Sequence, residues 1–142
     1  MKNINPLGLF DDHFLMEKLT KLGDPLQRLN DYINWNIFKA PLDKAFNEEA
    51  KDRAKVGRPS FDKLLMFKAL IIPSIYNLSD DQLEYQIVDR SSFKRFLGLK
   101  KSDKVPDSKT FWVFREQLIE NDVIIALFKT FNERLDSAGV FA

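Results

Sequence analysis

Residues 57–120 hold the strongest structural signal in the chain, and they read GRPSFDKLLMFKALIIPSIYNLSDDQLEYQIVDRSSFKRFLGLKKSDKVPDSKTFWVFREQLIE. From Phe61 to Tyr76, eleven of sixteen residues are apolar. They do not keep to one stripe, because the four consecutive apolar residues 64–67 point to four sides of a helix. A helix that is apolar on nearly all sides has to be surrounded by its neighbours. We therefore expect a buried central helix in an all-α, compact domain of about seven to eight helices.

Outward from this centre, helix signals follow one another. Pro73 predicts a kink or a break near Ile72, because proline lacks an N–H and clashes with the carbonyl four residues earlier. Ser79 and Gln82 form a capping box that opens the next helix. A short helix restarts at Ser91 or Ser92, with further apolar residues expected inside the core. These are Phe93, Phe96 and Leu97, before a left-handed end at Gly98 and Leu99.

The last two helices are predicted on either side of residue 121. Asp107 is the expected N-cap of the first, whose inward face is Phe111, Phe114 and Leu118. Asn121 or Asp122 is expected to cap the second. Its apolar residues recur at helical spacing up to the stop at Gly139, and they are Ile124, Leu127, Phe128, Phe131 and Leu135.

Ahead of the centre, we expect a helix over residues 11–22 that stops at Gly23. Asp24 is the predicted N-cap of a second helix, with Pro25 in its first position and Gln27 completing the cap. That helix would bury Leu26, Leu29, Ile33 and Ile37. Pro41 opens a third helix with Leu42, Ala45 and Phe46 on one face, and Ser60 is the expected N-cap of the central helix. We expect N-terminal helices and an exposed basic arm over 1–56, and a helical core over 57–142, packed together as one domain.

Composition narrows the class of protein. A chain of 142 residues fits one domain, and it contains no cysteine, which excludes disulfides and thiolate metal sites. The N-terminus does not read as a secretory signal, and charges interrupt the longest apolar run before it reaches the roughly 18 residues of a membrane span. These features predict a cytoplasmic protein without membrane contact.

Three blocks of this stretch, taken in order and spacing, resemble a known family. GRPSFDKLLMFKALII, YNLSDDQLEYQIVDRSSFKRFLGL and VPDSKTFWVFREQL are similar to the N-terminal domain of transposases from bacterial insertion sequences of the IS-five type. The likeness covers residues 57–138. It implies a helical domain ahead of a ribonuclease-H-like domain that holds divalent metal with two aspartates and a glutamate. The chain ends at Ala142, so that triad maps onto no residue here. We expect no catalytic residue, metal site or cofactor in this chain, and no small-molecule ligand.

Charge is concentrated in the middle of the sequence. Residues 51–115 hold 14 Lys and Arg against 8 Asp and Glu, whereas the flanking parts carry −2 and −3. Unpaired cations are what phosphate contacts require, so we expect double-stranded DNA as the partner of two basic clusters. The first lies on the arm: Lys51, Arg53, Lys55 and Arg58. The second begins in the short helix and continues past it: Lys94, Arg95, Lys100, Lys101, Lys104 and Lys109.

A helix-turn-helix arrangement would place the start of the helix after Asp107 in a groove, with Thr110 and Arg115 as base readers. The preceding loop is longer than that motif requires. We expect Trp112 and Trp35 to lie in the core or at a subunit interface, and not to contact DNA.

Other readings stay open. The basic clusters are also consistent with an ordinary solvated surface. An aromatic-rich helical domain is consistent with a dimerisation module that assembles paired DNA ends, as a homodimer through the central or the last helix. A free-standing hydrolase fits least. The carboxylates Asp80, Asp81 and Glu84 are ordinary for a first helical turn, and His13, the single histidine, is expected at the surface.

Overall fold

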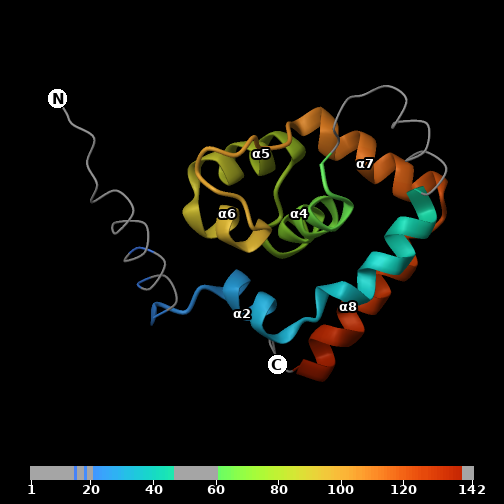
Figure 1. The fold of residues 1–142 in the computed structure, drawn as a ribbon, viewed down its shortest axis with the longest axis horizontal. Helices are drawn as coiled ribbons and strands as arrows, with labels where there is room; N and C mark the ends of the chain where they lie inside the picture. Colours follow the sequence, from blue (N-terminus) through green and yellow to red (C-terminus); the bar gives the residue numbers. More distant parts are fainter. Residues whose placement is uncertain (1–14, 16–17, 19–20, 47–60, 139–142) are drawn as a thin grey trace.

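The computed structural model describes residues 15, 18, 21–46 and 61–138, and the regular secondary structure of these residues is helical, with no strand. The all-α prediction is confirmed. Figure 1 shows the helices arranged around α4. The described elements are α2 (Pro25–Tyr32), the 3₁₀ helix η1 (Trp35–Phe38), a helical stretch over 39–46, α4 (Lys63–Tyr76), α5 (Asp80–Asp89), α6 (Ser91–Leu97), α7 (Ser108–Glu120) and α8 (Ile124–Ala138).

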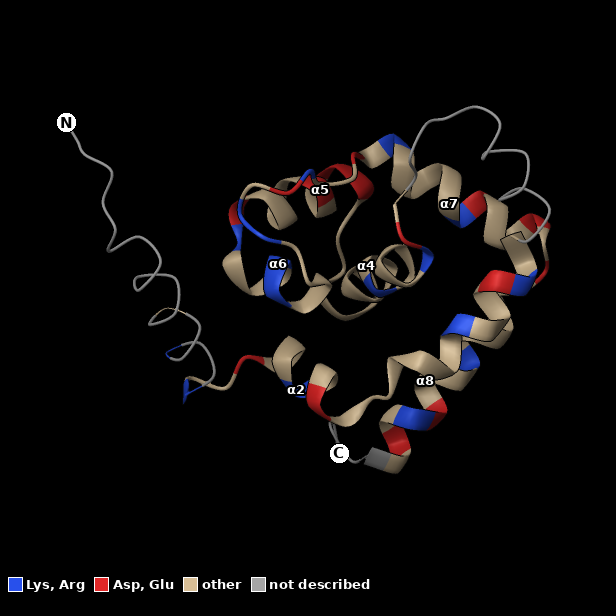
Figure 2. Ribbon diagram, viewed as in Figure 1, with Lys and Arg blue, Asp and Glu red and all other residues tan. Residues whose placement is uncertain are grey.

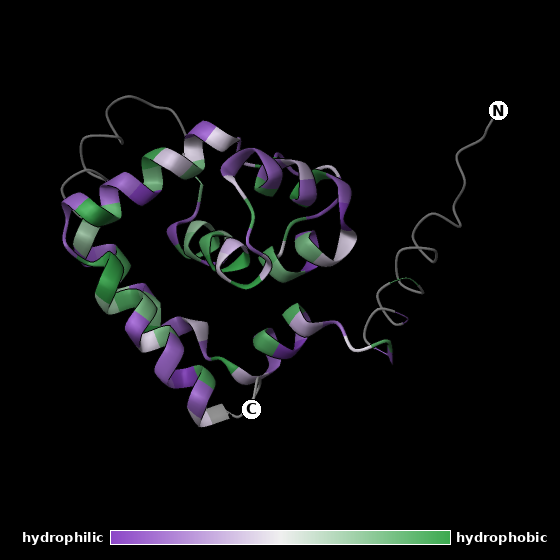
Figure 3. Cartoon of the chain, turned by 180° about the vertical axis from the view of Figure 1, so that it is seen from behind, coloured by the Kyte–Doolittle hydropathy of each residue, from purple (hydrophilic) through white to green (hydrophobic). Residues whose placement is uncertain are grey.

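Helix α4 is the buried centre that its composition predicts. Both α6 and α7 pack against it, and hydrophobic residues occupy several sides of it (Figure 3). Its fully or nearly buried residues are Met66, Phe67, Ala69, Leu70, Ile71 and Ile72.

Helix α4 differs from the prediction at its start and at Pro73. Asp62, not Ser60, is the N-cap, and its carboxylate accepts a hydrogen bond from the Leu65 amide at 3.0 Å. The helix runs without interruption past Pro73, so a break near Ile72 is wrong. Asn77 ends it with a left-handed backbone, at φ +56°.

Short-range caps position the next three helices as predicted. In the capping box of α5, the Gln82 amide donates to the Ser79 hydroxyl at 3.2 Å and the Ser79 amide donates to the Gln82 side chain at 2.8 Å. Helix α6 ends at Gly98, which has φ +75°. Asp107 caps α7 by accepting from the Thr110 amide at 2.8 Å.

Helix α8 begins differently from the prediction. Asp122 adopts a left-handed backbone at φ +55°, and the amides of Asp122 and Val123 bond back to carbonyls of α7. The Leu127 amide donates to the carbonyl of Val123 at 2.9 Å, so Val123 holds the N-cap position. The prediction of Asn121 or Asp122 as the cap is therefore wrong, because these residues terminate α7.

The N-terminal helices also depart from the prediction in detail. Asp24 caps α2 through the Leu26 amide at 3.0 Å, as expected. Gln27 does not complete a capping box, and its side-chain amide donates to Asp31 at 3.1 Å. The chain leaves α2 after Tyr32, so Ile37 lies in η1 and not in the same helix.

Aromatic rings join the N-terminal helices to the rest of the core. The ring centres of Phe38 and Phe67 lie 4.8 Å apart, and those of Phe46 and Phe114 lie 5.4 Å apart. Trp35 stacks on Phe131 of α8 at 6.0 Å. Residues 26–46 thus contribute to the same buried cluster as α4 to α8.

Some predictions concern residues outside the described part of the chain. They are most of the helix over 11–22, His13, the arm up to residue 56, Ser60 and Gly139. Within the described ranges, no helix combines the length and the apolar character needed to cross a membrane.

Candidate nucleic-acid interface

The connection between α6 and α7, residues 98–107, brings three lysines together on the surface. Lys100, Lys101 and Lys104 are all exposed. Figure 2 marks Lys and Arg in blue along this connection and on the adjacent α6. A surface loop that displays several ammonium groups is a suitable contact for the phosphates of a nucleic acid.

Hydrogen bonds fix the first half of this loop. Past the left-handed Gly98, the Leu99 amide donates to the carbonyl of Lys94 at 2.9 Å. Asp103 then closes a turn in both directions. Its carboxylate accepts from the Lys100 amide at 2.8 Å, and its own amide donates to the Lys100 carbonyl at 3.0 Å. The Asp103 side chain therefore shapes the loop that carries the lysines.

The second half of the loop is fixed by burial and by a double cap. Pro106 is buried, and Val105 packs against the core. Asp107 accepts from both the amide and the hydroxyl of Thr110, the latter at 2.6 Å. Hydrogen bonds from the Thr110 side chain and backbone lower the pKa of Asp107, helped by nearby lysines. The loop thus enters α7 in a defined direction.

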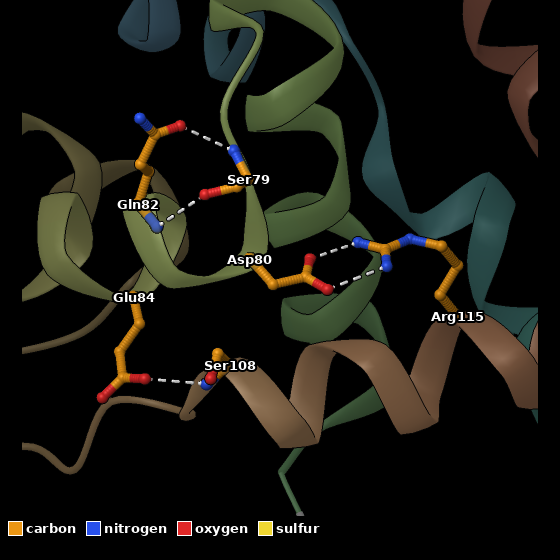
Figure 4. Close-up of polar contacts among 6 residues, drawn as sticks. All are labelled: Ser79, Asp80, Gln82, Glu84, Ser108 and Arg115. Carbon is orange, nitrogen blue, oxygen red and sulfur yellow. Dashed lines mark hydrogen bonds and ion pairs between the residues drawn. The ribbon is translucent and has the colours of Figure 1, made fainter.

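Helix α5 secures the other side of this entry. The Ser108 amide donates to the Glu84 carboxylate at 2.8 Å (Figure 4). With Thr110 already bound to Asp107, two first-turn amides of α7 have carboxylate partners. These two amides are therefore not available to bind a phosphate, although amides at helix N-termini often bind one.

Two of the four predicted arginines, Arg95 and Arg115, are held by carboxylates within the chain. Arg95 donates to Asp24 at 2.7 Å, and the Asp24 side chain is only 4% exposed. Arg115 donates to both oxygens of Asp80, at 2.6 and 3.1 Å (Figure 4). These hydrogen bonds to Asp80 raise the pKa of Arg115. Both arginines therefore connect elements of the fold, and we do not include them among the DNA contacts.

The remaining predicted residues are dispersed. Lys94 is half-buried on α6, whereas Lys109 is exposed in the first turn of α7. Thr110 is half-buried, and its hydroxyl donates to Asp107. The arm cluster of Lys51, Arg53, Lys55 and Arg58 lies outside the described residues.

The arrangement of helices bears on the helix-turn-helix prediction. The connection over 98–107 is longer than the three or four residues of that motif. Helix α7 packs mainly against α5. Groove insertion of α7 therefore stays a prediction, and Arg115 would first have to leave Asp80.

The acidic residues of α5 have structural roles. Asp80 binds Arg115, and Glu84 caps α7. Across the described ranges, no three carboxylate or histidine side chains are grouped closely enough to hold a metal ion.

The two tryptophans differ. Trp35 packs into the core and donates to the Asn30 side chain at 3.0 Å. Trp112 is 55% exposed, so its assignment to the core is wrong, and a subunit contact stays a prediction.

Lys68 is a residue that the sequence analysis did not single out. Burial lowers its pKa from 10.5 to about 8. The sequence signal for this burial is the position of Lys68 in a helix that is apolar on nearly all sides.

Comparison with known proteins identifies a family for this chain. A family model described as a transposase domain (DUF772) matches residues 13–117. The match includes α2, the central α4, the lysine-bearing loop and most of α7. No solved structure matches the chain. Because the family model covers well over half of the 142 residues, the chain belongs to the DUF772 transposase-domain family.

Proposed function

We propose that this chain is a DNA-binding N-terminal domain of an insertion-sequence transposase of the IS-five type, which helps to recognise the ends of the element. The observation that carries the proposal is the loop of Lys100, Lys101 and Lys104, whose backbone is fixed at both ends. Membership of a transposase family supports a role in transposition. Binding would be the contribution of this domain. Strand cleavage would belong to a ribonuclease-H-like domain with its own divalent metal.

The loop lysines suit contact with phosphates better than the reading of bases. An ammonium group is a compact charge without the planar fork that arginine uses for bidentate contacts. Because the backbone is fixed beforehand by Asp103 and Asp107, little ordering of the loop would accompany binding. Affinity gained in this way depends on counterion release, so it falls steeply as salt rises. We therefore expect these lysines to position the domain on duplex DNA of any sequence.

Charge reversal tests the placement. The variant Lys100→Glu/Lys101→Glu should bind duplex DNA more weakly whatever its sequence, by about tenfold or more at low salt, and should lose about 2 units of log–log salt slope. Fluorescence anisotropy with a labelled duplex at several salt concentrations measures both quantities.

The matched control is Lys39→Glu/Lys44→Glu, which changes the net charge equally at two exposed lysines on the 39–46 helix. It should bind nearly as the parent does. Equal losses of affinity in both variants would show that net charge alone causes the effect. Unchanged binding of the loop variant would refute the placement of the DNA contact on this loop.

A further inference from the structure

The ammonium group of Lys68 lies against aromatic rings from two other elements of the fold. Its nitrogen is 5.0 Å from the ring centre of Trp35 in η1 and 4.6 Å from that of Phe96 in α6. Within the described ranges, no carboxylate pairs with this ammonium, and burial is the cause that shifts its pKa. Buried cations are normally paired with an anion. In this respect Lys68 differs from Arg95 and Arg115.

Hydrogen bonds of Asn30 hold both rings in place. The indole N–H of Trp35 donates to the side-chain oxygen of Asn30 at 3.0 Å, and the Asn30 side-chain amide donates to the carbonyl of Phe96 at 3.3 Å. The Trp35 ring also stacks on Phe131, with 6.0 Å between the ring centres, and meets the Phe96 ring edge-on at 5.7 Å. The surroundings of the Lys68 amine are therefore fixed by contacts that do not involve the amine.

This cluster is not sealed from solvent. Asn30, Trp35 and Lys68 are each half-buried, whereas Phe96 is buried. The rings exclude part of the water that keeps a lysine charged, and the exposed part of the cluster leaves a path for a small reagent. A lysine desolvated in apolar surroundings is an activated nucleophile, because more of it carries a free lone pair.

We propose that Lys68 is an acylation site, at which the side-chain amine takes an acyl group from an activated acyl donor. With an acyl phosphate, the nitrogen lone pair attacks the carbonyl carbon and forms the amide bond. The bond from that carbon to the phosphate oxygen breaks, and the departing phosphate takes the electron pair and the proton that the nitrogen gives up. The product amide is neutral, so the cost of holding a charge in this cluster is removed.

The proposal is independent of DNA binding, because Lys68 is not one of the loop lysines. Acetyl phosphate and peptide mapping by mass spectrometry test it on the full chain. At about pH 7.5, about a quarter of Lys68 is neutral, against about one in a thousand for an ordinary lysine in water. Lower basicity and shielding by the rings offset part of this gain, so we expect an initial rate about fivefold above those of the exposed Lys39 and Lys44.

The pH dependence of the rate identifies its cause. Acetylation of Lys68 should stop accelerating above about pH 8, where most of the amine is neutral. An amine in open water becomes more reactive up to about pH 10. Unfolding the chain in guanidinium chloride should abolish the preference for Lys68, because the rings then no longer surround the amine.

Two matched variants assign the acetyl uptake. Lys68→Arg should lower the total uptake of the folded chain at about pH 7.5, because it removes the fastest of the three lysines compared. Lys44→Arg is the control, since it removes an exposed lysine with the same substitution, and it should leave the uptake nearly unchanged.

A Lys68 rate equal to or below those of Lys39 and Lys44 in the folded chain would overturn the proposal. A Lys68 rate that still rises towards pH 10, or a preference that persists in guanidinium chloride, would also overturn it, because the folded cluster would then not be its cause. None of these results bears on the loop lysines, which the charge-reversal variant tests separately.

Discussion

Lys68 lies in α4 with its ammonium nitrogen 5.0 Å from the ring centre of Trp35 and 4.6 Å from that of Phe96. The rings attract the cation through their electron-rich faces. Burial nevertheless removes water from the charge, and this lowers the pKa of Lys68 to about 8. The protonated amine of Lys68 is therefore less stable in the folded protein than in the unfolded chain.

The pH dependence of folding should reveal this. Between about pH 8 and 10.5 the unfolded chain still holds the Lys68 proton that the folded protein has released, so the contribution of this group to stability rises with pH. We expect a gain on the order of 1–2 kcal/mol, after allowance for partial exposure. Urea unfolding of the parent and Lys68→Met at pH values across that range measures it.

The comparison with Lys68→Met cancels the other groups that titrate in this range. Tyr76 is one of them, because burial and the charge of Asp24 raise its pKa, against the opposing effect of Arg90. If the parent and the variant gain or lose stability in parallel over this range, the lowered pKa of Lys68 is excluded.

The ion pairs show which residue-scale features the sequence can predict. Asp24, Ser79 and Asp107 were predicted as caps, because each bonds an amide within three residues. The partners of Arg95 and Arg115 are Asp24 and Asp80, far away in the sequence. No local pattern indicates such pairs, so Arg95 was predicted as a phosphate contact and Arg115 as a base reader.

At the scale of elements, two carboxylates of α5 fasten α7 at two points. Asp80 holds Arg115, and Glu84 holds the Ser108 amide (Figure 4). These contacts set the direction in which α7 leaves the lysine loop. Trp112, between Ser108 and Arg115 in the sequence, is left exposed.

A double-mutant cycle measures the strength of the ion pair between Asp80 and Arg115. Asp80→Ala and Arg115→Ala should each destabilise the fold, and the double variant should lose less than the sum, with a coupling of about 1 kcal/mol. The pair is bidentate and partly shielded from water, which places it above the average surface ion pair. Urea denaturation gives the three differences, and additive losses would contradict a direct interaction in solution.

Element boundaries were harder to predict than element existence. Ser60 and Asp62 both suit an N-cap, and the choice depends on where the core lets α4 begin. The turn after α7 offered Asn121 and Asp122 as caps, yet Asp122 takes the left-handed conformation that terminates the preceding helix. Pro73 lies inside α4 because the elements packed around this helix keep it helical beyond the missing N–H.

At the scale of the whole molecule, the aromatic contacts predict cooperative unfolding. Trp35 from the N-terminal part packs against Phe96 of α6 and Phe131 of α8. In a Trp112→Phe variant, Trp35 becomes the single tryptophan. Its fluorescence and the far-UV circular dichroism of all helices should then change at the same urea concentration. An earlier fluorescence transition would instead show that residues 1–56 unfold as a separate unit.

The overall class was predictable because the central helix is so uniformly apolar. The surface was less predictable, since exposure depends on how helices pack. Trp112 illustrates this, because its neighbours Phe111 and Phe114 are buried while the helix turns Trp112 outward.

Gly98 has a consequence for the path of the lysine loop. Its backbone φ of +75° suits glycine, yet no atom lies within 4 Å of the place that a Cβ would occupy. Handedness, and not crowding, therefore demands glycine here. L-alanine would be strained by about 1 kcal/mol, whereas its mirror image, D-alanine, would adopt this backbone without strain. The path of the chain that presents Lys100 and Lys101 therefore depends on the left-handed backbone of residue 98, and not on empty space beside it.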